Sequence, residues 1–100
     1  MKYYVDIDNT ICITCDKTRD YAAAKPIQKH IDKINRLYDE GNEIVYWTAR
    51  GSRTKTDWSE LTLKQLDSWG CKRHDVKFGK PDYDLFIEDK SVHPKDFFDD

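Results

Sequence analysis

Two aspartates stand at the end of the first apolar segment of the chain. Asp6 and Asp8 alternate with Val5 and Ile7, and Asn9-Thr10 follows directly. The β-branched and aromatic residues from Tyr3 to Ile7 are typical of a short buried strand. Ligands of α/β sheets bind at the carboxyl ends of the strands. We therefore predict that Asp6 and Asp8 converge on a metal ion and a phosphate, while the turn at Asn9-Thr10 supplies free backbone N–H groups.

Three further groups could take part in the same chemistry. Glu88-Asp89 follows an apolar run, where adjacent carboxylates are costly unless they face a cation. Thr48 and Ala49 follow another apolar run, and their hydroxyl and N–H could bond phosphoryl oxygens. Positive side chains in the next loop could hold an anionic part of a ligand, and they comprise Arg50, Arg53 and Lys55. A strand threonine, a charged strand end and a solvated loop remain the plain alternatives.

The elements expected to position these groups alternate between strand and helix. Strands are expected at 3–7, 43–48, 75–78 and 84–88. One helix is expected from Pro26 to Gly41 because of its apolar stripe, which contains Ile27, Ile31, Ile34, Leu37 and Tyr38. A second is expected from a capping box at 57–60 to Gly70, and Phe97-Phe98 is the expected anchor of a polar tail. This α/β pattern predicts a parallel sheet with right-handed crossovers and the strand order 3-2-1-4.

Length and composition limit the class of protein. One hundred residues predict a single domain over 1–100, with 38% apolar and 36% charged residues. A net charge of −2 gives no electrostatic footprint for nucleic acid, and no apolar run approaches the ~18 residues of a membrane span. Three cysteines are an odd count, which argues against a disulfide framework. We expect a cytoplasmic protein, and its small core leaves room for a homo-oligomer.

Four of these segments together resemble a known superfamily. Asp6-Ile7-Asp8-Asn9-Thr10, Val45-Tyr46-Trp47-Thr48, Lys80-Pro81 and Ile87-Glu88-Asp89 come in the order of the four motifs of haloacid dehalogenase-like (HAD) phosphatases. The closer likeness is to the small members without a cap domain that accompany capsule (surface-polysaccharide) biosynthesis. It is carried by Ala24-Lys25-Pro26-Ile27, Thr48-Ala49-Arg50-Gly51, Gly79-Lys80-Pro81 and Glu88-Asp89-Lys90-Ser91. The resemblance implies a small HAD-like, Rossmann-like sheet, and residues 11–25 are too few for an inserted cap.

The resemblance also implies a mechanism and a role for each motif residue. Asp6 would be the nucleophile that forms an aspartyl-phosphate, and Asp8 the general acid and base. Mg²⁺ would be held by Asp6, Asp8 and Asp89, with Glu88 as a water-mediated ligand. Thr48 and Lys80 would complete the catalytic set. Substrate contacts would come from Asn9, Ala49, Arg50 and Arg53.

The lysine of the third motif lies unusually close in sequence to the fourth motif. Lys80 and Asp89 are separated by only eight residues, which leaves little chain for a return to the far edge of the sheet. Lys77 and Lys90 are therefore alternatives to Lys80.

The expected function is Mg²⁺-dependent hydrolysis of a phosphate monoester. The closer resemblance suggests a sugar or polyol phosphate of surface-polysaccharide biosynthesis as the substrate. Two alternatives remain open, a HAD-fold phosphotransferase or phosphomutase and a non-catalytic Mg²⁺-binding module.

Overall fold

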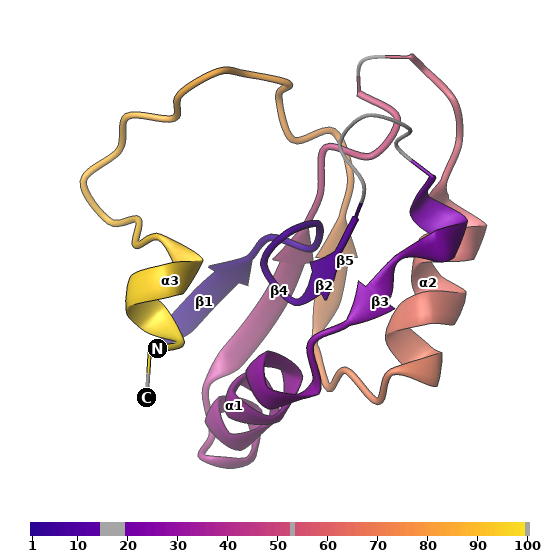
Figure 1. Cartoon of the computed structure of the whole chain (residues 1–100). Helices are drawn as coiled ribbons and strands as arrows, with labels where there is room; N and C mark the ends of the chain where they lie inside the picture. Colours follow the sequence, from indigo (N-terminus) through magenta and orange to yellow (C-terminus); the bar gives the residue numbers. More distant parts are fainter. Residues whose placement is uncertain (15–19, 53, 100) are drawn as a thin grey trace.

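The structure is a computed structural model, and it describes residues 1–14, 20–52 and 54–99. A three-stranded parallel sheet forms its centre (Figure 1). Strand β4 (Glu43–Trp47) lies between β1 (Lys2–Val5) and β5 (Asp75–Lys77). Val5 pairs with Tyr46, and Trp47 pairs with Lys77, so that the carboxyl ends of the strands meet at one edge. The predicted α/β class with a parallel sheet is confirmed.

The prediction of a fourth strand at 84–88 is wrong. Residues 84–88 form neither strand nor helix, and they lie in a long exposed segment that arches from β5 to the C-terminal helix (Figure 1). Leu85 and Ile87 are 76% and 90% exposed. The order 3-2-1-4 is therefore not obtained, although the first three predicted strands do adopt the order 3-2-1. An apolar run this short does not specify which strand edge it pairs with.

The two predicted helices are present with shifted starts. Helix α1 is Gln28–Asp39, and it buries Ile31 and Ile34 of the predicted stripe. Pro26 is not its first residue but belongs to β3 (Lys25–Pro26), which pairs with β2 (Cys12–Ile13). Gly41, at φ +97°, ends the helix as expected, because its N–H bonds Tyr38 O while Asn42 N–H bonds Leu37 O.

Helix α2 (Ser59–Ser68) begins after Trp58, so the predicted capping box is displaced. Asp57 lies one residue before the cap and accepts hydrogen bonds from the N–H and hydroxyl of Ser59, at 2.9 and 2.6 Å. The structure also contains two short helices, η1 (Tyr21–Ala23), where the sequence allowed a turn of helix, and α3 (Pro94–Phe97) in the tail.

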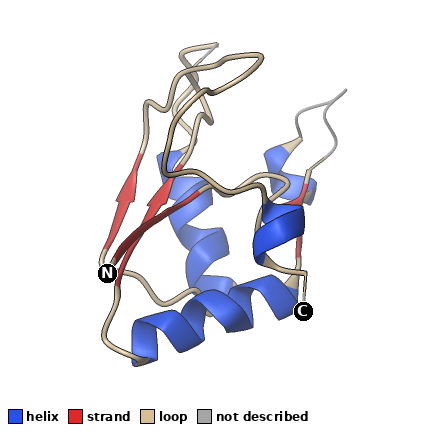
Figure 2. Ribbon diagram, turned by 90° about the vertical axis from the view of Figure 1, so that its left-hand side faces the viewer, coloured by secondary structure: helices blue, strands red, loops and turns tan. Residues whose placement is uncertain are grey.

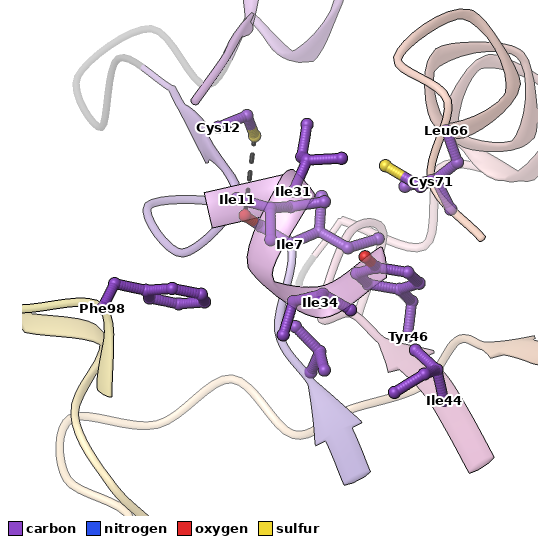
Figure 3. Close-up of a cluster of buried hydrophobic side chains, with 11 residues drawn as sticks. Ile7, Ile11, Cys12, Ile31, Ile34, Ile44, Tyr46, Leu66, Cys71 and Phe98 are labelled. Atoms are coloured by element: carbon purple, nitrogen blue, oxygen red, sulfur yellow. Dashed lines mark hydrogen bonds between the residues drawn. The ribbon is translucent and has the colours of Figure 1, made fainter. Parts of the chain in front are cut away.

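One hydrophobic core lies between the sheet and the helices. The helices are on one side of the three strands (Figure 2). Figure 3 shows the buried cluster, to which β1, α1, β4, α2 and the segments that flank them contribute: Val5, Ile7, Ile11, Cys12, Ile31, Ile34, Ile44, Tyr46, Leu66, Cys71 and Phe98. Phe98 is 6% exposed and stacks on His30, with ring centroids 4.0 Å apart, which confirms the predicted anchor of the tail. None of the described helices has the length and apolar character that a membrane crossing requires.

Candidate active site

The candidate site lies where β1 and β4 end. Asp6 follows Val5, and Thr48 follows Trp47, at adjacent positions of the parallel sheet. After Asp6 the chain turns sharply, because Ile7 O accepts hydrogen bonds from the N–H groups of Thr10 and Ile11. Asn9 sits at φ +60°, a left-handed conformation that asparagine tolerates better than most residues. The turn brings Asp8 back beside Asp6.

Asp6 is a half-buried carboxylate with a cationic neighbour. Lys80 Nζ lies 3.6 Å from Asp6 Oδ1, and the Thr10 hydroxyl donates to Oδ2 at 3.5 Å. Burial raises the pKa of Asp6, the charge of Lys80 offsets part of this rise, and the nearby Asp8 adds to it. The environment therefore disfavours the ionised form of Asp6, so a further cation at this carboxylate would be stabilising.

Asp8 is held by side chains on two sides. The Thr14 hydroxyl donates to Asp8 Oδ1 at 2.6 Å. Arg50 donates to both carboxylate oxygens of Asp8, from Nη2 to Oδ1 at 2.8 Å and from Nε to Oδ2 at 3.0 Å. This two-point pairing of a guanidinium with a carboxylate fixes the orientation of both groups.

Arg50 directs its guanidinium toward the protein rather than toward solvent. The residue is 3% exposed, and its Nη1 donates to Thr62 Oγ1 at 3.1 Å and to Gln65 Oε1 at 2.6 Å. The ring of Tyr21 lies over the guanidinium, with its centroid 4.7 Å away. Arg50 was predicted to contact the substrate, whereas the structure assigns most of its donors to Asp8 and helix α2.

Lys80 reaches Asp6 through the loop that follows β5. Its backbone N–H donates to Thr48 O at 3.2 Å, and its carbonyl accepts from the Ser52 hydroxyl at 2.7 Å. These two bonds tie the loop to the end of β4. The alternatives lie elsewhere, because Lys77 Nζ donates to the Tyr4 hydroxyl and Lys90 belongs to the exposed segment. Among the three lysines considered, the structure places Lys80 beside Asp6.

Two neighbouring cavities open at this edge. One has a volume of about 310 Å³ and is lined by Asp6, Asp8, Asn9, Ala49, Arg50 and Lys80, among others. The other, of about 460 Å³, shares Arg50 and Lys80 with the first and extends to Trp58 and Phe78. Thr48 lines neither cavity; it is 1% exposed, and its hydroxyl accepts the N–H of Arg50 at 3.1 Å.

Two predicted site residues, within the part of the chain that the structure describes, are not brought to this edge. Glu88 and Asp89 lie in the exposed segment and do not line either cavity, because residues 84–88 do not form the strand that would carry them there. Within the described ranges, no cluster of three or more histidine, cysteine or acidic residues could hold a metal. Arg53 lies outside the described residues.

The donor atoms at this edge still suit Mg²⁺ in kind. Mg²⁺ prefers hard oxygen ligands and is commonly held by one or two carboxylates together with water and substrate phosphate. Asp6 offers such an oxygen, and its raised pKa shows that its charge is incompletely compensated. The carboxylate of Asp8 is already paired with Arg50, so Asp6 is the principal side-chain donor.

Sequence reasoning missed the residues that surround Asp8. Thr14, Thr62 and Gln65 are buried polar residues, and Tyr21 covers Arg50. Nothing in their spacing marks them, since they lie just after β2, on α2 and on η1 and meet only in the folded chain. Cys12 is also buried here; burial raises the pKa of its thiol to about 11, so the thiol stays protonated and points to Ile7 O at 3.5 Å (Figure 3).

Comparison with known proteins finds a protein of similar fold but no matching family model. No family model matches the sequence, and no curated protein matches it. The crystal structure of an MCSG target from Vibrio cholerae is similar, with a TM-score of 0.84 and 28% sequence identity over 97% of this chain and 86% of that chain. This chain thus shares its small α/β fold, nearly from end to end, with a bacterial protein of known structure.

Proposed function

We propose that the protein hydrolyses phosphate monoesters in a Mg²⁺-dependent reaction with Asp6 as the nucleophile. The observation that carries the proposal is the pairing of Asp6 with Lys80 beside Asp8, at the carboxyl ends of parallel strands and in the wall of a cavity. The four motifs in HAD order support the same conclusion. Asp6 is accessible enough to react, since 38% of its side chain is exposed.

In the first step, an oxygen of Asp6 attacks phosphorus, and the bond to the ester oxygen breaks. Asp8 donates a proton to the leaving alkoxide, and it then takes a proton from the water that hydrolyses the acyl phosphate. The described contacts favour Asp8 Oδ2 for this exchange, because Oδ1 accepts from both Thr14 and Arg50 whereas Oδ2 accepts from Arg50 Nε.

Two groups would bind the transferring phosphoryl. Lys80 places a positive charge beside Asp6, where the anionic phosphate would otherwise be repelled. Ala49 lines the cavity, and its N–H is proposed to donate to a phosphoryl oxygen. The buried Thr48 contributes by shaping the turn that presents Ala49 and by holding Lys80 through its carbonyl.

Mg²⁺ would be held by Asp6 and the backbone carbonyl of Asp8, with Asp89 and Glu88 completing the set. The bound ion supplies charge neutralisation between the nucleophile and the phosphate. Asp89 and Glu88 can take this role only if the exposed segment that carries them moves to the site.

A sugar or polyol phosphate is the proposed substrate. This follows from the capsule-type resemblance, and the cavity beyond Lys80 offers room for a leaving group of that size. Its volume of about 460 Å³ lies in the usual range of small-molecule sites.

One observation favours a different function. Because Glu88 and Asp89 lie away from Asp6, the chain could bind Mg²⁺ weakly without turnover, as a non-catalytic module. The test is Mg²⁺-dependent phosphate release from a panel of sugar and polyol phosphates, with Asp6→Asn beside the wild type. Turnover that both EDTA and Asp6→Asn abolish supports hydrolysis; Mg²⁺ binding with no release from any substrate supports the module.

A further inference from the structure

Two buried polar residues on α2, Thr62 and Gln65, hold Arg50 from the side away from Asp8. Thr62 is fully buried and Gln65 is 9% exposed, and neither lines a cavity. Both accept from the same nitrogen, Nη1 of Arg50, at 3.1 and 2.6 Å. Polar acceptors on the core side of a helix reduce the apolar surface that it can bury, so their presence calls for a reason.

The planar geometry of the Arg50 guanidinium gives a reason for these two buried acceptors. The group is planar, and its Nε–Nη2 edge can meet a carboxylate through two parallel bonds only when the plane is aligned with it. Nη1 points away from that edge. Fixing Nη1 on Thr62 and Gln65 therefore fixes the plane and keeps the Nε–Nη2 edge on Asp8.

The same residues also close the guanidinium off from water. Gln65 Nε2 donates to the carbonyl of Tyr21 at 2.6 Å, which holds η1 in place, and the ring of Tyr21 covers the guanidinium. Trp58, just before α2, packs edge-on against this ring at 5.1 Å. A hydrogen bond sheltered in this way is stronger and more directional than one in water.

We propose that Gln65 and Thr62 are positioning residues, which align Arg50 and through it hold Asp8 in the orientation needed for proton transfer. Helix α2, which supplies no cavity-lining group of its own, thereby sets the geometry of the second carboxylate of the site. The kinetic part of this proposal rests on the proposed phosphatase function; the structural part, alignment of the Arg50–Asp8 pair, does not.

The test compares wild type, Thr62→Val, Gln65→Leu and the double variant. Thr62→Val is nearly isosteric and removes only the acceptor. Gln28→Leu is the matched control, since Gln28 lies exposed on α1, where its amide contacts Asp32. The first readout is the Nε–H signal of Arg50 in a ¹H–¹⁵N spectrum, assigned by its loss in Arg50→Lys. The second is the split between kcat and KM for the best phosphate ester.

We expect the Nε–H signal to move upfield and broaden in the double variant and partly in Thr62→Val, and to stay unchanged in Gln28→Leu. We expect kcat to fall about tenfold to a hundredfold in the double variant, the size of effect that a misplaced catalytic group produces, with KM within about twofold of wild type. A fall in stability alone would not separate kcat from KM in this way.

A folded variant lacking both acceptors that keeps the wild-type Nε–H signal and kcat would overturn the proposal. If the double variant does not fold, the same criteria apply to Thr62→Val. If wild type hydrolyses no ester, the proposed function fails, and the Nε–H signal alone decides whether Thr62 and Gln65 align Arg50.

Discussion

Asp6 combines partial burial with a titratable carboxylate, and this has a measurable consequence for the stability of the chain. Burial raises its pKa, so the ionised form is less favourable in the folded chain than in the unfolded chain. The free energy of unfolding should therefore fall as the pH rises from the ordinary carboxyl pKa to the raised one, and stay lower above it. Asp6→Asn keeps the size of the side chain and removes the charge.

We predict that, without metal, Asp6→Asn unfolds at a higher temperature than wild type at neutral pH. This difference should disappear below about pH 3, where Asp6 is protonated in both the folded and the unfolded chain. Thermal melts in EDTA across this pH range measure the difference. A variant that is less stable than wild type at neutral pH, by a margin that grows with pH, would mean that Lys80 outweighs burial.

Tyr46 is a second residue whose burial has a measurable consequence. Its hydroxyl is buried and has no hydrogen-bond partner within the described part of the chain. Burial, aided by the neighbouring Cys71 thiol, raises the pKa of Tyr46 well above its usual value. Tyr46 is therefore neutral in both the folded and the unfolded chain up to the unfolded pKa of ~10. As the pH rises further, the free energy of unfolding falls, because the side chain ionises more readily in the unfolded chain.

Tyr46→Phe should leave stability at neutral pH unchanged or raise it by up to about 1 kcal/mol, because it removes an unpaired buried polar group. It should also weaken the loss of stability above about pH 10. Urea unfolding at neutral and alkaline pH measures both effects. A loss of more than about 1 kcal/mol at neutral pH would show that the hydroxyl has a partner after all.

At the scale of elements, local sequence patterns predicted most of the framework. The apolar stripe of α1 and the continuous apolar run of β4 each specify one element, because periodicity and burial agree in them. The starts of both helices were misplaced by one or two residues, since several residues near each start can cap it. The prediction of a strand at 84–88 failed for a different reason: the apolar run there is too short to specify which edge of the sheet it would pair with.

The proposed role of Asp89 as a Mg²⁺ ligand can be tested separately. If Asp89 is a ligand, Asp89→Asn should weaken Mg²⁺ binding at least about tenfold in a calorimetric titration. Asp84→Asn, a charge-matched change in the same exposed segment, should leave the affinity unchanged. Equal affinities for wild type and Asp89→Asn would remove Asp89 from the site.

The loop after β4 depends on the glycine that ends the Thr48-Ala49-Arg50-Gly51 segment. Gly51 has φ +82°, and a Cβ there would lie 2.2 Å from Thr56 O. Gly79 offers a matched control, since it has φ +85° and no neighbour within 4 Å of its would-be Cβ.

Both alanine variants should lose about 1–2 kcal/mol through backbone strain. Gly51→Ala should lose about 1–3 kcal/mol more, because the loop must open to admit the methyl group. Chemical unfolding of the two variants measures the gap. Equal losses would show that the loop yields without cost.

At the scale of the whole molecule, the fold explains which site residues could be predicted. Asp6 and Thr48 follow recognisable strands, so parallel pairing places them together. Arg50 is 42 positions from Asp8 in the sequence and 15 positions from Gln65. No pattern in a single sequence indicates that these residues contact one another. The one-sided packing of the helices was not visible either, since it depends on which strand faces are covered (Figure 2).

In the proposed mechanism, Asp6 carries the phosphoryl group during turnover. The most direct measurement is acid quenching of a single turnover, followed by mass spectrometry of the peptide that contains Asp6. We predict one phosphoryl group on Asp6, which appears with Mg²⁺, disappears as phosphate is released, and is absent in Asp6→Asn. Turnover of the ester without phosphorylation of Asp6, or with phosphorylation of another residue, would contradict it.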